Sequence, residues 1–564
     1  MAAGCRKAGA GEQSPQTPGR MFPSGGGFAS LGPERLLDAQ RAVGMEFTES
    51  ERAQMLAQLD GQLALLDARR SFAPAWELQP AHVFRPDLPG HKGPPKDEFV
   101  PRERKVAPPG SAVDVAFASL YELSTWLRTK EISSLELTDL YLARLEEHGS
   151  KLECVVTLTP ELARARARRA DQELAAGTIR GPLHGIPWGA KDLLDTKGLA
   201  TTWGATPFKE RVAKVDAAVV ERLEAAGAVL VAKLSLGALA YGDIWFGGKT
   251  RSPWNLDEGS SGSSAGSAAA VVAGLVGFAI GSETLGSIVA PSTRCGAAGF
   301  RPSFGRVSRY GAMPLAWSLD KLGPLCRYAE DCAMVFSAID GLDLRDASSR
   351  SAHFAYRPDA ERRYRVAYDP AWFEDLGDEY ERALRDLSAS NIELVERRWP
   401  ELNWDALLVG LFGETAAALE SLTRSGRDDE LVWQDDVAWP NTLRSSWFIP
   451  AADLVQADRM RRRGMELARE AFAGVDAWVS ASRGDPMLVA TNYVGTPSLT
   501  VRAGFSKHRA RELSGLEADA GDLREVPHSL TFWGGLDQDG TLIALGERAE
   551  ARWGAAGRRP ELFV

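Results

Sequence analysis

The segments Gly259-Ser-Ser-Gly-Ser-Ser-Ala-Gly-Ser267 and Gly281-Ser-Glu-Thr-Leu-Gly-Ser287 are the most informative part of this sequence. The apolar run 265–280 between their serines is shorter than the ~20 residues of a membrane span, and it predicts a buried helix followed by a buried strand. A flexible Gly/Ser linker would not continue directly into such a run. Upstream, Gly185-Ile-Pro-Trp-Gly-Ala-Lys191 places a lysine among apolar residues.

These residue types suit hydrolysis through a serine. A serine hydroxyl is a weak nucleophile, so it needs a group that accepts its proton and N–H donors for the developing oxyanion. Small residues around Ser287 let backbone N–H groups approach one point. Burial of Lys191 beside Ile186 and Trp188 would lower its pKa and favour the neutral amine that a base requires. The alternative is a surface lysine paired with Asp192.

The three motifs together resemble the amidase signature family, from about residue 120 to the C-terminus. The resemblance implies that Lys191 is the base, Ser263 a bridging serine and Ser287 the acylated nucleophile. It also implies a cis peptide between Gly262 and Ser263, with Ser264 as a supporting hydrogen-bonding residue. The oxyanion hole would consist of the backbone N–H groups of Thr284, Leu285, Gly286 and Ser287.

The resemblance further implies an α/β fold with one large mixed sheet enclosed by helices. In the implied mechanism, neutral Lys191 draws a proton from Ser287 through Ser263, and the acyl-enzyme is then hydrolysed by water. The expected function is an amidase that acts on a linear carboxamide. A carbamate or ester hydrolase that uses the same triad is an open alternative, because acyl-enzyme chemistry is shared.

Four positions depart from the usual family pattern. Ala265 and Leu285 stand where the family usually has glycine, Glu283 replaces an aspartate, and Val289 stands where arginine is common. The apolar replacements predict a substrate with an apolar or aryl part. Three aromatic residues are candidates for an apolar wall of the pocket, with core packing as an equal alternative: Trp245, Phe246 and Trp447. The stretch 301–310 is interpreted as structural.

A second alternative is a protein similar to the glutamine-hydrolysing subunit of an amidotransferase, which releases ammonia from glutamine for a tRNA-amidating partner. Such family members carry a Tyr-Asp-Gly-Val/Ile-Arg-Tyr-Gly-like stretch in the C-terminal half, which the sequence lacks. A third alternative is an α/β-hydrolase, because residues 262–266 fit G-x-S-x-G with Ser264 as nucleophile and His508 or His528 as base. That motif requires a preceding strand, whereas residues 251–258 look turn-like.

Composition excludes several other classes of function. The 564 residues include 66 basic and 76 acidic side chains, a net charge of −10 that disfavours binding to nucleic acid or an anionic membrane. The five cysteines are unpatterned, and no metal-ligand motif is found, so neither metal nor cofactor is expected. We expect a cytoplasmic enzyme with a small-molecule amide substrate, since no signal peptide is readable. The oligomeric state stays open, with a homodimer among the options.

The chain is predicted to have three parts. Residues 1–32 are rich in Gly, Ser and Pro and are predicted to be disordered. Residues 33–112 hold a helix over 48–70, capped by Thr48 and Glu51, and a proline-rich arm that either wraps the core or tethers this helix. Residues 113–564 alternate between helix and strand and form the predicted catalytic domain.

Overall fold

A large mixed sheet is the centre of the computed structural model, which describes residues 33–71, 76, 78–374, 376–481, 485–513, 518 and 521–564. The segment 1–32, predicted to be disordered, lies outside these residues. The chain divides into two units, Met1–Ala75 and Trp76–Val564. In the first unit, α1 spans Pro33–Ala42 and α2 spans Glu49–Ser71. The predicted capping box is present, since Glu51 Oε2 accepts from Thr48 N at 2.7 Å and Thr48 Oγ1 accepts from Glu51 N at 3.3 Å.

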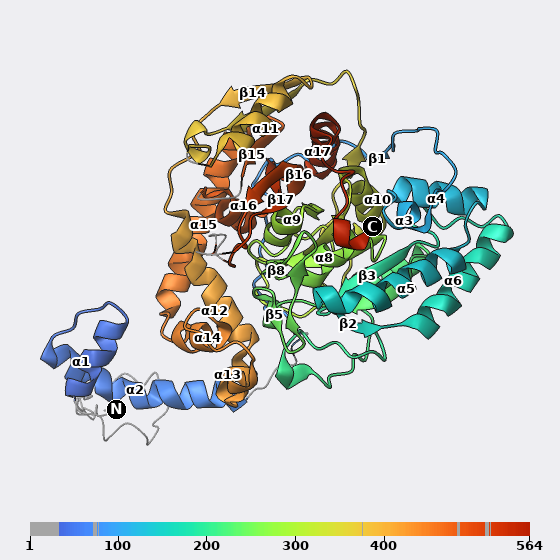
Figure 1. The fold of residues 1–564 in the computed structure, drawn as a ribbon. Coiled ribbons are helices and arrows are strands. Elements are labelled where there is room, and N and C mark those ends of the chain that lie inside the picture. The colour runs from blue at the N-terminus through green and yellow to red at the C-terminus, as the bar shows by residue number, and fades with distance from the viewer. Residues whose placement is uncertain are drawn as a thin grey trace, which may run out of the picture. The chain divides into compact units, whose positions relative to one another are not determined.

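In the described part of the second unit, the sheet has eleven strands in the order β14-β13-β15-β17-β16-β10-β11-β9-β3-β4-β2 (Figure 1). The strand bounds in that order are Ile392–Glu396, Tyr364–Tyr368, Ala477–Ser480, Arg524–Gly534, Ser498–His508, Ala298–Arg301, Lys321–Cys326, Phe278–Glu283, Pro187–Lys191, Val229–Leu234 and Val155–Leu158. β3 pairs in parallel with both β4 and β9, whereas β9–β11–β10–β16–β17 are antiparallel. The mixed α/β sheet inferred from the family resemblance is therefore confirmed.

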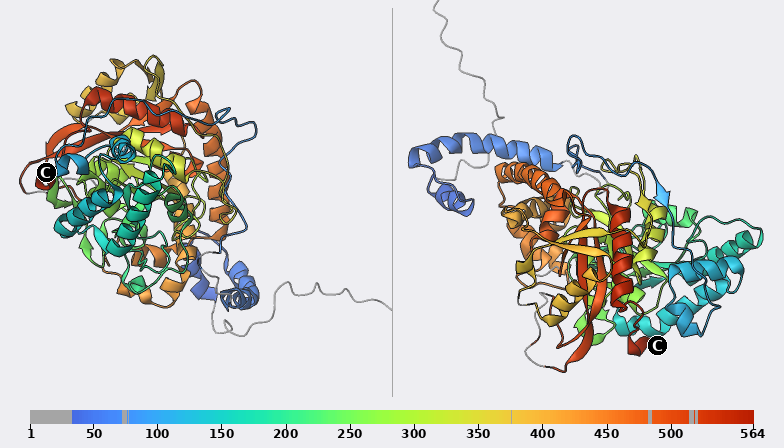
Figure 2. Two further views of the ribbon diagram at one scale, coloured as in Figure 1. Left: turned by 90° about the vertical axis from the view of Figure 1, so that its right-hand side faces the viewer. Right: turned by 90° about the horizontal axis from the view of Figure 1, so that it is seen from above.

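The central strands are buried on both faces. Every residue of β3, β4, β9 and β11 is buried, the pattern of strands covered on each side by other elements. Helices lie along the sheet in both views of Figure 2, including α17 beside the long strand β16. The helices of this unit are α3 Ala112–Ala116, α4 Leu120–Thr129, α5 Ser134–Leu152, α6 Pro160–Ala175, α7 Ala218–Ala225, α8 Ala265–Val272, α9 Val289–Cys295, α10 Ala329–Ile339, α11 Asp378–Ser388, α12 Leu408–Ala418, α13 Glu420–Arg424, α14 Trp439–Ser446, α15 Ala451–Phe472, α16 Met487–Val494 and α17 Asp539–Trp553.

Local signals in the sequence placed several elements correctly. The apolar run 265–280 forms α8 and the first half of β9, so the predicted buried helix followed by a buried strand is present. The segment 251–258 is a correction, because it forms a hairpin of β7 (Arg251–Ser252) and β8 (Asn255–Gly259) rather than a turn. Two further short pairs are β1 (Glu98–Phe99) with β12 (Ala355–Tyr356), and β5 (Ile244–Trp245) with β6 (Gly248–Lys249).

From Trp76 onward, the described residues of the proline-rich arm pack against the rest of the second unit. Of the two options for the arm, this corresponds to an arm that wraps the core. Phe84 meets Phe304 edge-on at 5.0 Å, and β1 extends the arm as a strand beside β12. His91 Nε2 lies 2.9 Å from Asp537 Oδ2, and Arg104 makes two hydrogen bonds to Glu330.

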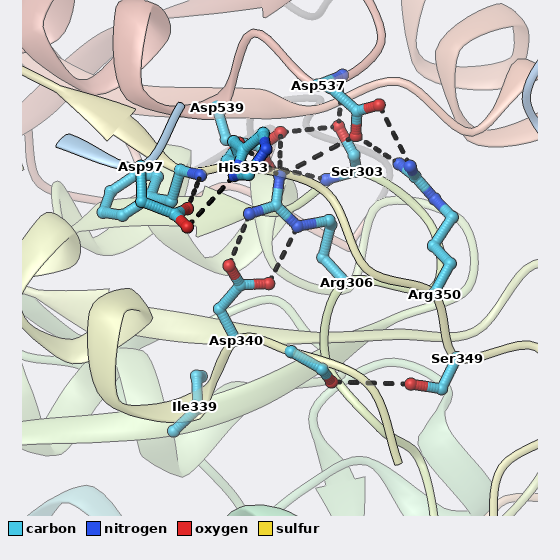
Figure 3. Close-up of polar contacts among 12 residues, drawn as sticks. Asp97, Ser303, Arg306, Ile339, Asp340, Ser349, Arg350, His353, Asp537 and Asp539 are labelled. Carbon is cyan, nitrogen blue, oxygen red and sulfur yellow. Dashed lines mark hydrogen bonds and ion pairs between the residues drawn. The ribbon is translucent and has the colours of Figure 1, made fainter. Parts of the chain in front are cut away.

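The arm meets a buried ion network (Figure 3). Arg306 is fully buried and donates from Nε to Asp340 Oδ1 at 2.8 Å, with a second bond from Nη2 to the same carboxylate. Asp537 and Asp539 lie 3.7 and 3.6 Å from Arg306 Nη1. Arg350 donates to Asp537, which ties the segment before β12 to the segment before α17. One guanidinium thus faces three carboxylates from two separate parts of the chain.

We predict that Arg306→Met lowers the free energy of unfolding by about 3–5 kcal/mol, because removing one partner leaves buried carboxylates uncompensated. Urea unfolding followed by circular dichroism measures this loss. Arg357→Met is the control: Arg357 is exposed and pairs with Glu98 at the surface, so we expect a change below about 1 kcal/mol. Equal effects of the two substitutions would contradict the structural importance of the network.

Candidate active site

Lys191 is the last residue of β3, the third strand from one edge of the sheet, and it is completely buried. Lys191 Nζ lies 2.8 Å from Ser263 Oγ, 3.0 Å from Ser264 Oγ and 2.9 Å from Ser282 Oγ. The structure therefore brings the predicted lysine into contact with the predicted bridging serine. Ser282, at the end of β9, is a third hydroxyl that the sequence interpretation missed.

Burial lowers the pKa of Lys191 well below its usual range, and the nearby carboxylates of Asp320 and Glu283 only partly oppose this shift. The neutral amine is thereby favoured. The alternative of a surface lysine paired with Asp192 is wrong. Asp192 instead lies 2.9 Å from the amine of Lys233, which is buried beside it on β4, and accepts from Thr202 N.

The loop that carries Ser263 connects β8 to α8 and allows no larger residue at Gly262. The peptide bond between Gly262 and Ser263 is cis, as the family resemblance implied. A Cβ on Gly262 would lie 1.9 Å from Gly242 O, inside van der Waals contact. On the next residue, Ser264 Oγ donates to Ser282 O at 3.1 Å and accepts from Ser282 N at 3.2 Å. Ser264 thus joins its own loop to β9.

Ser287 lies in the loop between β9 and α9. Ser264 N donates to Ser287 O at 3.1 Å, which holds the two serine loops together. Gly286, just before Ser287, has a φ of +87°, a conformation that favours glycine. The side chain of Ser287 is only 8% exposed. The predicted nucleophile and the predicted bridging serine therefore belong to loops in direct contact.

Glu283 holds this loop in place through hydrogen bonds to its backbone. Its Oε2 accepts from Ile288 N at 2.8 Å and Val289 N at 2.9 Å, and its Oε1 accepts from Arg301 and from Asn492. Burial by itself raises the pKa of Glu283, but the Arg301 guanidinium and the N–H donors lower it to about 2. The ionised carboxylate thus fixes the backbone directly after Ser287. Arg301 has the structural role that the sequence interpretation gave to its stretch.

Thr284 is held by a second buried carboxylate. Thr284 Oγ1 donates to Asp320 Oδ1 at 2.6 Å, and Asp320 Oδ2 accepts from Leu315 N and Ala316 N. Burial raises the pKa of Asp320. Asp320 could not be found from the sequence, because it lies 36 residues from Thr284 and belongs to no motif.

A small cavity borders Ser282 and Thr284, with a volume of about 40 Å³. Tyr310, interpreted from sequence as structural, is part of its wall. Lining residues include Ser282, Thr284, Tyr310, Met313, Trp317 and, from the arm, Trp76.

The three aromatic residues predicted as a pocket wall do not line this cavity. Trp245 is buried and donates from Nε1 to Glu153 O at 3.1 Å, with Phe246 edge-on against it at 4.9 Å. Trp447 is 39% exposed at the end of α14. A role of these residues in substrate binding stays a prediction.

The histidines proposed for the Ser264 alternative have other partners. His508 Nε2 lies 2.8 Å from Ser506 Oγ, and His528 packs against Tyr380. The contacts described for Ser264 Oγ are to Lys191 and Ser282. This environment suits a supporting hydroxyl better than a serine activated by histidine.

Within the described ranges, no group of three or more His, Cys, Asp or Glu side chains could hold a metal ion. Nor does any helix in the same ranges have the length and apolar character to cross a membrane. Cys295, the last residue of α9 and eight residues after Ser287, is a buried thiol whose pKa burial raises, so it is poorly suited to act as a nucleophile.

Comparison with known proteins gives one family. The family model described as Amidase matches residues 136–441. Among relatives, a glutamyl-tRNA(Gln) amidotransferase subunit from Methylococcus capsulatus is 46% identical over 233 residues, which are 41% of this chain and 48% of that protein. The chain thus spans about half the length of that relative. The protein of the same name from Halorhodospira halophila is 37% identical over 371 residues, 63% of this chain and 73% of the relative.

Solved structures with the same fold carry other names. The peptide amidase from Stenotrophomonas maltophilia superposes with a TM-score of 0.67 at 28% identity, over 79% of this chain and 99% of that chain. A bacterial aryl acylamidase of the amidase signature enzymes superposes equally well, with a TM-score of 0.67, over 79% of this chain and 99% of its own. At 20% identity, the second likeness shows the fold alone.

Glu283 gives a pH-dependent prediction. Its pKa falls from the ordinary 4.5 to about 2 on folding, so its contribution to stability is complete above about pH 4.5 and is lost as the pH falls towards 2. We expect the difference in unfolding free energy between the wild type and Glu283→Gln to shrink by roughly 3 kcal/mol over this range. Urea unfolding at several pH values measures it. Glu401→Gln, at an exposed glutamate, should follow the wild type. A difference that is independent of pH would contradict the prediction.

Proposed function

The chain belongs to the amidase family, and on that premise we propose that it hydrolyses a carboxamide through an acyl-enzyme on Ser287. The observation that carries the proposal is the contact of 2.8 Å between the buried Lys191 amine and Ser263 Oγ. A lysine with a lowered pKa, in contact with a serine whose loop touches the Ser287 loop, is a base positioned to activate a hydroxyl.

The contacts of Lys191 also suit the neutral form. A neutral amine has two N–H bonds and one lone pair. Ser264 Oγ donates its own proton to Ser282 O, so it can accept one N–H. Ser282 can accept the other, through its Oγ at 2.9 Å or its backbone O at 3.4 Å. The lone pair is then left for the hydroxyl of Ser263, which is the direction that proton transfer requires.

The proposed reaction begins as Ser287 Oγ attacks the amide carbonyl carbon. Its proton passes to Ser263 Oγ while the proton of Ser263 passes to Lys191 Nζ. Backbone N–H groups of residues 284–287 stabilise the oxyanion, in a loop whose conformation Glu283 and Asp320 fix. The C–N bond then breaks, and the leaving nitrogen takes the proton back from Lys191 through Ser263. Water hydrolyses the resulting ester, with the same relay accepting its proton.

A second candidate is release of ammonia from glutamine for a partner protein. The identity to proteins named as glutamyl-tRNA(Gln) amidotransferase subunits favours it. The absence of the Tyr-Asp-Gly-type stretch from the sequence and the net charge of −10 favour an independent hydrolase. Hydrolysis of a carbamate or ester by the same residues stays a further alternative within the same chemistry.

The first test uses the purified chain with a panel of aliphatic amides, anilides, carbamates, esters and glutamine. We expect turnover of simple amides without any partner, and a loss of at least about three orders of magnitude in Ser287→Ala. An activated phosphonate should label Ser287, as peptide mass mapping would detect. Label on Ser264 alone would support the α/β-hydrolase alternative. Glutamine turnover that requires a tRNA-amidating partner would support the second candidate.

The second test concerns the base. Below its pKa, Lys191 is protonated and cannot accept a proton, so kcat/KM should decrease as the pH is lowered through that pKa. This acid limb of the pH–rate profile should lie well below pH 10.5, the ordinary pKa of a lysine. We expect Lys191→Ala to lower kcat by orders of magnitude and to abolish this limb, as a pH–rate profile would measure.

Lys321→Met is the matched control. Lys321 is another buried lysine whose pKa burial lowers, but its amine donates to Leu319 O rather than to these serines. The acid limb should persist in this variant. An acid limb that persists in Lys191→Ala, or turnover that His508→Ala or His528→Ala abolishes, would overturn the assignment.

A further inference from the structure

The proline-rich arm contributes to the wall of the candidate site. Trp76 and Gln79 line the cavity that also borders Ser282 and Thr284. They precede α3 and the family match at residue 136, so nothing in the matched segment supplies them. The arm is thus part of the wall of this cavity, which reaches Thr284 but is not lined by Lys191, Ser263 or Ser287.

Contacts with the body of the unit hold Trp76 in this position. Its ring meets the buried Trp203 edge-on, with ring centroids 5.6 Å apart. The guanidinium of Arg211 lies 4.9 Å from the Trp76 ring centre and is itself fixed by two hydrogen bonds to Asp195. Edge-to-face pairs and cation–π contacts each contribute on the order of 1 kcal/mol. The ring is therefore positioned by side chains outside the arm.

The arm is fixed again just after Trp76. Gln79 Oε1 accepts from Ala347 N at 3.0 Å. Further along, the ring of Phe84 packs against Phe304 and against the guanidinium of Arg461, whose Cζ is 3.3 Å from the ring centre. These successive attachments make this stretch a wall whose position the fold determines.

The wall leaves little room beside Thr284. The cavity volume is about 40 Å³, so the large side chains of the wall leave only a narrow space for a substrate group. The remaining wall includes other large side chains, Tyr310, Met313 and Trp317. Trp76 is the large side chain of this wall that lies on the arm rather than on the sheet or its loops.

We propose that Trp76 is a specificity-determining residue, which restricts the substrate group beside Thr284 to a few carbon atoms. The preferred substrates are then small aliphatic amides rather than aryl amides. This inference rests on the proposed function for its catalytic consequences. It assigns the limit on substrate size to the arm, whereas the sequence analysis placed the pocket wall at Trp245, Phe246 and Trp447.

The experiment compares kcat/KM for propanamide and benzamide in the wild type and in Trp76→Ala. We expect the wild type to prefer propanamide. In Trp76→Ala, the benzamide-to-propanamide ratio should rise by at least about tenfold, because each additional buried CH₂ equivalent gains about fourfold. Propanamide turnover should change by less than about threefold, since the proposed chemistry does not use Trp76. Trp76→Phe should give an intermediate ratio.

Trp553→Ala is the matched control, because Trp553 is also half-buried and stacks on an aromatic ring, Phe532, but does not line the cavity. It should leave the ratio unchanged. A uniform loss on both substrates in Trp76→Ala would overturn the inference and make Trp76 a packing residue. A wild type that already prefers benzamide would also overturn it.

A binding measurement separates this inference from the proposed function. In a Ser287→Ala background, calorimetric titration with uncleaved benzamide should show at least about tenfold tighter binding when Trp76→Ala is added. Equal binding with and without Trp76 would reject the inference even if amide hydrolysis is established. Tighter binding in a chain that hydrolyses no amide would retain the role of Trp76 and reject the proposed function.

Discussion

Burial of the Lys191 amine is the constraint on which the rest of this site depends. A charged lysine is costly on a fully buried strand, and the surroundings supply hydroxyls rather than a directly paired carboxylate. The neighbouring lysine on β4 shows the contrast, because Lys233 is equally buried but pairs with Asp192 at 2.9 Å. Two buried lysines on adjacent parallel strands thus have opposite environments, and the one surrounded by hydroxyls is the one that contacts the serine loops.

Two buried carboxylates hold the loop that carries Ser287. Glu283 is kept ionised by Arg301 and by N–H donors, and it binds the backbone after Ser287. Asp320 holds the segment before it through Thr284. Each oxygen of the two carboxylates has an N–H, hydroxyl or guanidinium partner, and these hydrogen bonds restrain the backbone on both sides of Ser287. Rigidity of this kind is what an oxyanion hole requires.

The arm adds a layer that the family match does not contain. It is joined to the body through aromatic contacts near the cavity, a short strand at β1 and the ion network around Arg306 and Asp537. Each of these contacts contributes little energy by itself, but together they fix the position of the arm on the second unit. A segment outside the matched region can therefore alter what reaches the candidate site without altering the residues proposed to perform the chemistry.

The motifs around Lys191, Ser263 and Ser287 identified the family by resemblance, and this resemblance in turn implied the fold class and the grouping of Lys191 with the serine loops. Such motifs tolerate little change, because a glycine such as Gly262 stands where no larger residue fits. Helix caps and apolar runs likewise predicted α2, α8 and β9. Only the tertiary structure decided the roles of Asp320, Lys233 and Trp76. Their partners lie tens to more than a hundred residues away, and no local pattern encodes such a contact. The same limit explains why the aromatic residues of the cavity wall were not predicted. Trp245 and Trp76 have no distinguishing local sequence pattern, but the packing of distant segments buries Trp245 against Glu153 O and places Trp76 in the wall of a cavity.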